Sequence, residues 1–286
     1  NSKHIHNTIS SILEQGDMPQ NTEIIVVGLD EPGLIPSHER VLFVPTREPV
    51  CAARARNIGS RHAKGEFICF TDADCLVMPG WLSHLVYWLE KGYVAVGGSV
   101  GAEGRNYWGT CDNLVSFFPS LPFMPSGKRP YLPSLNLAIS RRVLLEIGGF
   151  DESFPGAAGE DVDLSFRLRQ RGYMLYFEPK ALIIHNHERM DAQSVWRHLF
   201  RFGEVWMLLR ERFPNMKKSG FWVDMARQFP YAFRISTPLV ALFEVFRFFS
   251  QSSKMLQYWY TVPGLFWGKL ALYNGIASAM LCKTKE

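Results

Sequence analysis

Two acidic residues follow an apolar run near the first quarter of the chain. Residues 66–71 read EFICFT, and Asp72-Ala73-Asp74 comes directly after them. Carboxylates in a tight turn at the end of a strand offer hard oxygen ligands to Mg²⁺ or Mn²⁺, ions that also bridge substrate phosphates. A solvated acidic turn has the same composition. The position after a strand favours a site, because open α/β sheets bind ligands at the carboxyl ends of their strands.

A second acidic group, Glu160, Asp161 and Asp163, falls within four residues. Acidic side chains stabilise a helix N-terminus through the macrodipole, which gives a purely structural explanation. Three carboxylates exceed what capping needs, however, and a carboxylate beside a hydroxyl group can act as a general base. The run therefore predicts a helix start that also carries chemistry.

Imidazole and guanidinium groups could complete such a site. His185 and His187 follow a second apolar run, and neutral imidazole is a plausible Mn²⁺ ligand beside a carboxylate. The two histidines share a face only if the strand continues through both. Arg54 and Arg56 lie in a segment rich in Ala and Arg, where they could bind phosphate or carboxylate or simply form a solvated helix face.

Alternating segments must position these side chains. The apolar spacing predicts helices and strands in turn, which indicates an α/β sheet with helices on both faces. We expect residues 106–130 to be irregular and helices to dominate from residue 191 onward. The expected helices are 4–15, 52–63, 80–90 and 160–171, and the expected strands are 23–28, 41–44, 66–71, 93–97, 131–140, 173–177 and 181–185.

Composition excludes several classes of protein. Hydrophobic residues make up 47% and charged residues 20%, which excludes disordered, collagen-like and coiled-coil chains. A net charge of +4 is too small to indicate a nucleic-acid partner, and we expect none. Five cysteines without a CxxC pair indicate a reducing, cytoplasmic compartment.

Charge is divided unevenly along the chain. Residues 1–188 hold 17 basic and 21 acidic side chains, a net −4, whereas residues 189–286 hold 14 basic and 6 acidic, a net +8. The second part also contains 20 of the 39 aromatic residues. We expect the two parts to have different roles.

Two runs carry a family resemblance. Residues 55–82 (ARNIGSRHAKGEFICFTDADCLVMPGWL) resemble the donor-binding core of the family 2 inverting glycosyltransferases, and residues 136–187 resemble the acceptor half of that family, in the same order. The resemblance covers roughly residues 1–205. It implies an α/β fold of GT-A (Rossmann-like) type, a mixed sheet flanked by helices, with a helical, aromatic and basic C-terminal extension over residues 206–286.

The resemblance also implies roles for single residues. Asp72 matches an aspartate that contacts the nucleotide ribose, and Asp74 matches the aspartate that holds the metal at the diphosphate. Asp161 matches the catalytic base, and Glu160 the neighbour that helps to bind the acceptor. His185, preferred to His187 as the nearer to the strand end, would complete the metal site.

Two further residues are assigned to the nucleotide-sugar donor. Arg56 is expected to contact it through its guanidinium group. Asp30 lies near where the family places a nucleotide-contacting aspartate, although the family pattern VVDDGS is VVGLDEPG in this chain.

The implied reaction is a single displacement that moves a sugar from a nucleotide-diphosphate sugar to a hydroxyl of a glycan or lipid-linked acceptor, with inversion and with Mn²⁺ or Mg²⁺. Processive members carry a QxxRW motif, whereas residues 193–197 read QSVWR, which favours addition of one sugar.

A nucleotidyltransferase would need a Gly-rich basic phosphate loop near the N-terminus, and we find none. A non-catalytic sugar-nucleotide-binding or scaffold protein that keeps the fold is the remaining alternative.

Both ends of the chain add an expectation. The family opens with a strand of the type SVIIPTYN, and this sequence begins where that strand would end, so we expect the first strand to be missing and nucleotide binding to be weakened.

Residues 229–249 and 257–282 are apolar and aromatic. They fit helices that pack on the catalytic domain or on another subunit, or a helix pair on an anionic membrane. The expected location is the cytoplasm, including the inner face of the cytoplasmic membrane.

Overall fold

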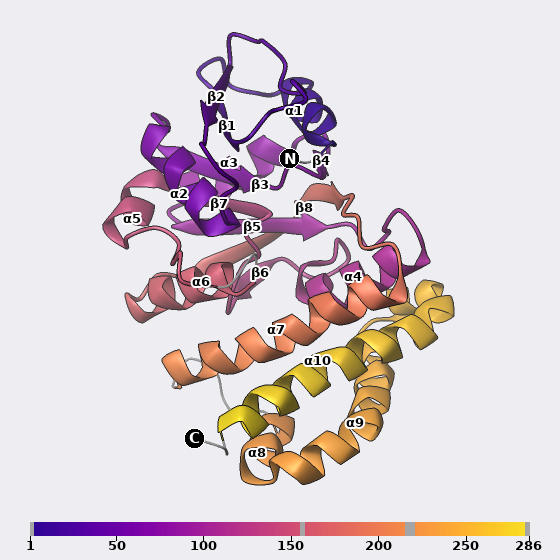
Figure 1. Ribbon diagram of the computed structural model, residues 1–286. Coiled ribbons are helices and arrows are strands. Elements are labelled where there is room, and N and C mark those ends of the chain that lie inside the picture. Colours follow the sequence, from indigo (N-terminus) through magenta and orange to yellow (C-terminus); the bar gives the residue numbers. More distant parts are fainter. Residues whose placement is uncertain (1–2, 155–157, 215–220, 284–286) are drawn as a thin grey trace. The chain divides into compact units, whose positions relative to one another are not determined.

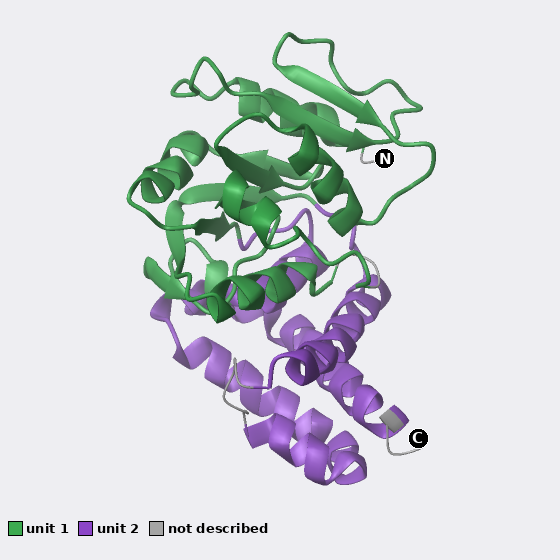
Figure 2. Cartoon of the chain, turned by 90° about the vertical axis from the view of Figure 1, so that its left-hand side faces the viewer, with its two compact units in different colours: residues 1–101, 119–186 green, residues 102–118, 187–286 purple. Residues whose placement is uncertain are grey.

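The computed structural model describes residues 3–154, 158–214 and 221–283. It divides into two compact units (Figure 2). The first comprises residues 1–101 and 119–186, and the second comprises residues 102–118 and 187–286. The helix Ala192–Arg212, within which the expected boundary after residue 205 falls, belongs to the second unit.

The first unit contains a six-stranded sheet, which is mixed as the family resemblance implies. Its order is β3-β7-β5-β8-β4, with β6 also paired to β8. Strands β5 and β8 are parallel, and the other pairs are antiparallel. A separate parallel pair joins β1 to β2. The bounds are β1 Ile24–Gly28, β2 Val41–Pro45, β3 Phe67–Thr71, β4 Cys75–Val77, β5 Ala95–Val100, β6 Gly127–Arg129, β7 Asn136–Ser140 and β8 Leu175–His185.

Helices flank this sheet (Figure 1). They are α1 Ile5–Leu13, α2 Ala52–His62, α3 Trp81–Glu90, α5 Arg141–Glu146 and α6 Glu160–Gln170, and a short 3₁₀ turn, η1, covers Phe118–Ser120. Apolar side chains from α5 and α6 pack on β3 and β7 in one buried cluster that includes Phe70, Ile139, Leu144, Leu164 and Leu168. Burial of this apolar surface fixes α6, and with it the acidic run at its start, against the sheet.

A buried polar network shapes the centre of the sheet. The Asn136 side chain donates from Nδ2 to the carbonyl oxygens of Ser99 and Ala181, both at 2.8 Å, and accepts from Trp81 Nε1 at 2.8 Å. The β5–β8 register shifts between Gly98 and Ser99. A Cβ at Gly98 would lie 2.2 Å from the Ala181 carbonyl oxygen, so only glycine fits this close approach.

The register shift between β5 and β8 explains why one prediction from the sequence is wrong. We predict two strands over 173–177 and 181–185, whereas the structure has the single strand β8. The residues between the two predicted strands form a bulge within β8, because Gly98 pairs with Glu178 and the next β5 residue, Ser99, pairs with Leu182. The strand therefore runs through to His185, opposite Cys75 at the start of β4.

The second unit is helical. It contains α4 Tyr107–Phe117, α7 Ala192–Arg212, α8 Phe221–Gln228, α9 Pro230–Ser250, the 3₁₀ segment η2 Ser253–Thr261 and α10 Val262–Lys283. Helices α7 and α10 lie side by side (Figure 1). A Cβ at Gly203 would lie 2.1 Å from the Leu272 carbonyl oxygen, and one at Gly275 would lie 2.0 Å from that of Phe200. Glycine at both positions lets the two backbones approach closely.

Helix α4 is a second correction, because residues 106–130 are expected to be irregular. Asn106 begins the helix by accepting a hydrogen bond from Gly109 N at 2.9 Å. Residues 109–115 are all buried, including the polar Thr110, Asp112 and Asn113, so the helix lacks the solvent-exposed polar face of an ordinary surface helix.

Among the described helices, none combines the length and the apolar character needed to cross a membrane.

Candidate active site

Arg56 joins two of the predicted acidic groups. It extends from α2 and donates from Nη2 to Asp72 Oδ1 and from Nη1 to Glu160 Oε1, each at 2.8 Å. Asp72 directly follows β3 and Glu160 begins α6, so one guanidinium connects the carboxyl end of a strand to the start of a helix. Burial by itself would lower the pKa of Arg56, but the two carboxylates raise it above its usual value.

Glu160 and Asp161 lie side by side in different surroundings. Glu160 is 3% exposed, and its second oxygen, Oε2, is buried and accepts no hydrogen bond from the described residues. Burial and the neighbouring Asp161 charge therefore raise the pKa of Glu160, although Arg56 opposes the shift. Asp161 is half-buried, and its oxygens accept from Ser134 N at 3.2 Å and Val162 N at 2.8 Å. Burial also raises the pKa of Asp161.

The third carboxylate of the acidic run has a structural role. Asp163 is fully buried, and Arg167 donates to it from Nε at 2.7 Å. The same Arg167 donates to the carbonyl oxygens of Ile147 and Gly149 at 3.0 and 2.7 Å. Asp163 thus orients an arginine that holds the turn before Phe150, and only Glu160 and Asp161 of the run face the network around Arg56.

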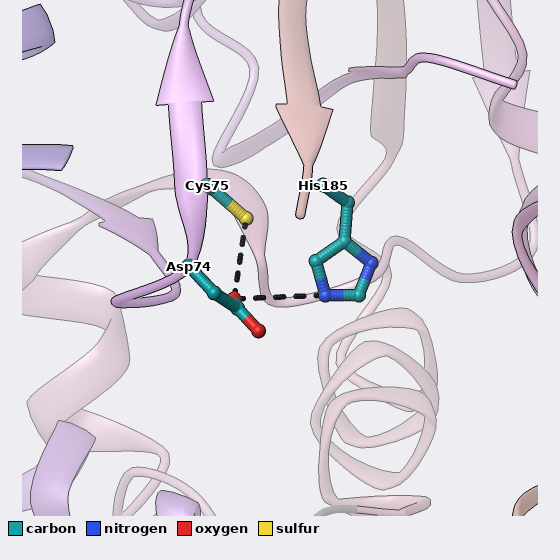
Figure 3. A group of neighbouring side chains, drawn as sticks. All are labelled: Asp74, Cys75 and His185. Atoms are coloured by element: carbon teal, nitrogen blue, oxygen red, sulfur yellow. Dashed lines mark hydrogen bonds and ion pairs between the residues drawn. The ribbon is translucent and has the colours of Figure 1, made fainter. Parts of the chain in front are cut away.

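Asp74 and His185 come together at the edge of the sheet (Figure 3). His185 Nε2 lies 3.6 Å from Asp74 Oδ1, and Asn186 N donates to the Asp74 carbonyl oxygen at 2.8 Å. Cys75 Sγ lies 3.9 Å from the same Asp74 oxygen, and the ligand atoms of the three residues fall within 4.8 Å of one another. Pairing of β4 with β8 creates this contact, since Cys75 is the partner of His185 in the register.

These donor atoms fit a divalent cation. One carboxylate oxygen and one imidazole nitrogen suit an ion of the Mn²⁺ type, whereas an imidazole is a poorer ligand for Mg²⁺. Burial, followed by the charges of Asp72 and Asp74, holds the pKa of the Cys75 thiol well above its usual value. The thiol therefore stays protonated and is a poor ligand.

The two histidines of the HNH run have different partners. His185 belongs to the first unit and contacts Asp74, whereas His187 belongs to the second and lies 3.3 Å from Asp112 Oδ2. Asp112 is fully buried and also binds Arg189 at 2.8 Å and His198 at 2.7 Å. Burial opposes its ionisation, but these three partners hold its pKa far below its usual range.

Sequence reasoning missed Asp112. The available signal was a single charged residue within an apolar helix, since a buried carboxylate needs a partner. It also missed Ser134, whose contribution is a backbone amide and therefore has no signature in the side-chain sequence.

Asp30 stays within its own loop after β1. Its oxygens accept hydrogen bonds from Leu34 N at 2.8 Å and Ile35 N at 3.1 Å. No hydrogen bond or ion pair among the described residues joins it to Arg56 or Asp72. Its expected contact with a nucleotide remains a prediction.

Known proteins resemble this chain in sequence. Residues 1–148 match Glycosyl transferase family 2, and residues 129–202 match Glycosyltransferase like family 2. The pre-mycofactocin glycosyltransferase of Mycobacterium tuberculosis is 30% identical over 160 residues, which cover 54% of this chain and 34% of that protein. Human polypeptide N-acetylgalactosaminyltransferase 3 is 28% identical over 199 residues, covering 58% of this chain and 31% of the relative. The chain thus spans about a third of the length of these relatives.

Solved structures share the fold. The mannosyltransferase PcManGT from Pyrobaculum calidifontis, in complex with GDP-Man and Mn²⁺, aligns over 100% of this chain and 85% of its own, with a TM-score of 0.62 and 19% identity. GalNAc-T7 with UDP, GalNAc and Mn²⁺ aligns over 80% of this chain and 54% of its own, with a TM-score of 0.51 and 16% identity. The sheet and its flanking helices are therefore a GT-A fold. Because the family match extends over more than half of the sequence, the chain belongs to glycosyl transferase family 2.

Proposed function

We propose that this protein transfers one sugar from a nucleotide-diphosphate sugar to a hydroxyl group of a glycan or lipid-linked acceptor. The observation that carries the proposal is the network in which Arg56 binds both Asp72 and Glu160, with Asp161 beside it. Asp74 and His185 complete the site two residues beyond Asp72 and at the end of β8. Relatives named as glycosyltransferases, and related folds solved with GDP-Man or UDP, support this assignment.

Asp74 and His185 are the residues that would hold a divalent cation. When bound, such an ion supplies positive charge that stabilises the leaving nucleoside diphosphate. Both structural relatives named above were solved with Mn²⁺, which supports the same ion here. Asp72, held by Arg56 and partly exposed, is suited to accept hydrogen bonds from the nucleotide ribose.

Asp161 is proposed as the general base. Two backbone amides orient its carboxylate, and its raised pKa makes it a stronger proton acceptor than an ordinary aspartate. It would take the proton from the acceptor hydroxyl as that oxygen attacks the anomeric carbon and the bond to the diphosphate breaks. Glu160 is engaged by Arg56 and would instead help to position the acceptor. One base acting in one displacement gives inversion at the anomeric carbon.

The proposed location in the cell fits the proposed acceptor. A cytoplasmic protein that works at the inner face of the membrane would meet both a soluble nucleotide sugar and a lipid-linked acceptor. The net charge of +8 and the aromatic content of residues 189–286 support such a location.

The test pairs an Asp161→Asn variant with a matched exposed aspartate, Asp17→Asn. Nucleotide sugars are first screened with Mn²⁺ for thermal stabilisation of the wild-type protein, since a ligand that binds only the folded state raises the apparent stability. With the donor that binds, Asp161→Asn should lower transfer at least about 100-fold while keeping the stabilisation, because general base catalysis contributes that much. Asp17→Asn should behave as the wild type.

Near-normal transfer by Asp161→Asn would contradict the base assignment. Donor binding with neither transfer nor hydrolysis in the wild-type protein would favour the non-catalytic alternative. Inversion is tested separately by the anomeric configuration of the product in NMR spectra. Retention of the donor configuration would contradict the single displacement.

A further inference from the structure

Helix α9 has a strip of large apolar side chains that face solvent. Their exposed fractions range from 51% to 82%, and at about 100° per residue they fall within an arc of about 120°. The strip therefore runs along one face of the helix. Its members are Tyr231, Ile235, Leu239, Leu242, Phe243 and Phe246.

The opposite face of α9 is already used for packing. Phe233, Val240, Val245 and Phe248 are buried there, and Phe233 and Val240 pack with side chains of α8 and α10. Helix α9 is thus apolar on both sides, a pattern typical of a helix that is covered all round. Single exposed apolar residues are ordinary on protein surfaces, but a continuous strip of six indicates an interaction surface.

Cations border the strip on both sides. By the helical spacing, Arg234 lies beyond one edge of the arc and Arg247 beyond the other, and both are exposed. The only acidic residue of α9, Glu244, lies on the buried face at 5% exposed. It accepts from Arg247 Nε at 3.0 Å and from Arg247 Nη2 at 2.5 Å, so the charge of Arg247 is paired. The exposed face of α9 therefore carries the positive charge of Arg234 and no carboxylate.

The segment that follows α9 has the same character. In η2, Leu256, Trp259 and Tyr260 are exposed by 61%, 72% and 45%. Lys254 is exposed as well, and η2 contains no acidic residue. Tryptophan and tyrosine favour the boundary between lipid headgroups and acyl chains, because one part of the ring is apolar and another is polar.

We propose that the outward face of α9, together with the exposed residues of η2, docks on the surface of a bilayer that contains anionic lipids. This inference rests on the proposed function, because these residues would hold the protein at the proposed membrane location. The apolar strip would enter the headgroup region, and Arg234 and Lys254 would contact the lipid phosphates.

Charge argues against a second copy as the occupant. Homodimers usually pair the same patch about a two-fold axis, so each copy would bring its own Arg234 and Lys254 to the interface. Like charges placed together oppose association. An anionic surface satisfies the apolar strip and its cationic borders at once.

The experiment is flotation of the full chain with vesicles of phosphatidylcholine alone or with a third of phosphatidylglycerol. The wild-type protein should float with the anionic vesicles and much less with the neutral ones, and high salt should reduce the binding. Ile235→Glu and Phe246→Glu replace side chains that are 82% and 74% exposed and should each lower the bound-to-free ratio at least about tenfold. Met174→Glu, at a side chain that is 52% exposed in the first unit, is the matched control and should bind as the wild type.

Thermal unfolding of each variant checks that the fold is kept, which the high exposure of the replaced side chains leads us to expect. Equal flotation of the wild type and both α9 variants would overturn the proposal, as would a wild type that binds neither vesicle. A wild-type dimer that Ile235→Glu dissociates, measured by light scattering without vesicles, would assign the face to a second copy. Donor binding and transfer to a water-soluble acceptor are measured without vesicles, so failure to dock is distinguishable from failure of the proposed catalytic function.

Discussion

Replacing Glu160 by glutamine should change how the stability of the protein depends on pH. The amide keeps an oxygen that can accept the hydrogen bond from Arg56, so the shape of the site is preserved while its ionisation is removed. In the wild-type protein, burial and the Asp161 charge raise the pKa of Glu160 from its ordinary value of 4.5 to about 7. The folded state therefore holds a proton that the unfolded chain has released between these two pH values.

The sign and size of the effect follow from this difference. A carboxyl group whose folded pKa is raised makes unfolding release a proton, so the free energy of unfolding falls as pH rises from about 4.5 to about 7 and is level above that. Each pKa unit corresponds to about 1.4 kcal/mol, so the loss is on the order of 3 kcal/mol across the window. Glu160→Gln lacks this loss, and its stability relative to the wild type should increase steadily between pH 5 and pH 7.

Urea denaturation at half-unit steps from pH 4.5 to 8 measures the difference directly. Glu146→Gln is the matched control, because the Glu146 side chain is half-exposed and pairs with Arg142 on its own helix. Its stability relative to the wild type should be constant over the same range. A constant difference for Glu160→Gln as well would refute the reasoning, since it would show that the carboxyl group titrates alike in the folded and unfolded states.

Two further predictions concern the other clusters. Asp74→Asn should weaken binding of Mn²⁺ at least about tenfold, measured by the rise in the thermal midpoint on titration with the ion. Asp30→Asn is the control and should bind Mn²⁺ as the wild type does. An unchanged Mn²⁺ response in Asp74→Asn would contradict the proposed metal site. Asp112→Asn should lower the free energy of unfolding by about 3–5 kcal/mol in urea at pH 7. It leaves the partly buried guanidinium of Arg189 and two imidazoles without the fully buried carboxylate that they share, and a loss below about 1 kcal/mol would contradict the assigned role.

Local patterns predicted most elements of the first unit. The runs before Gly28 and Asp72 are short, apolar and bounded by turn residues, so they are recognisable as strands from neighbouring residues alone. Helix α4 and the continuous β8 were missed for the opposite reason. The polar side chains of α4 are buried instead of facing solvent, and the continuity of β8 depends on its pairing with the distant strand β5 on both sides of a bulge.

In the candidate site too, some features were predictable from neighbouring residues and others depend on contacts between distant residues. Residue type and position indicated Asp72, Asp74, Glu160, Asp161 and His185 as chemical groups. The sequence could not indicate that Arg56 binds Asp72 and Glu160 at once, since these residues are 16 and 104 positions away from it. Nor could spacing decide which histidine faces Asp74, because that depends on pairing of β4 with β8.

The sequence by itself determined the fold class, the family and the acidic groups available for chemistry, because each is encoded in short runs whose neighbours suffice to interpret them. The tertiary structure alone decided which groups meet: Arg56 with its two carboxylates, His185 with Asp74, and His187 with Asp112. It also decided which face of α9 is exposed, since both faces are apolar and only packing against α8 and α10 distinguishes them. Contacts between distant residues depend on the summed packing of many elements, and no local pattern records that sum.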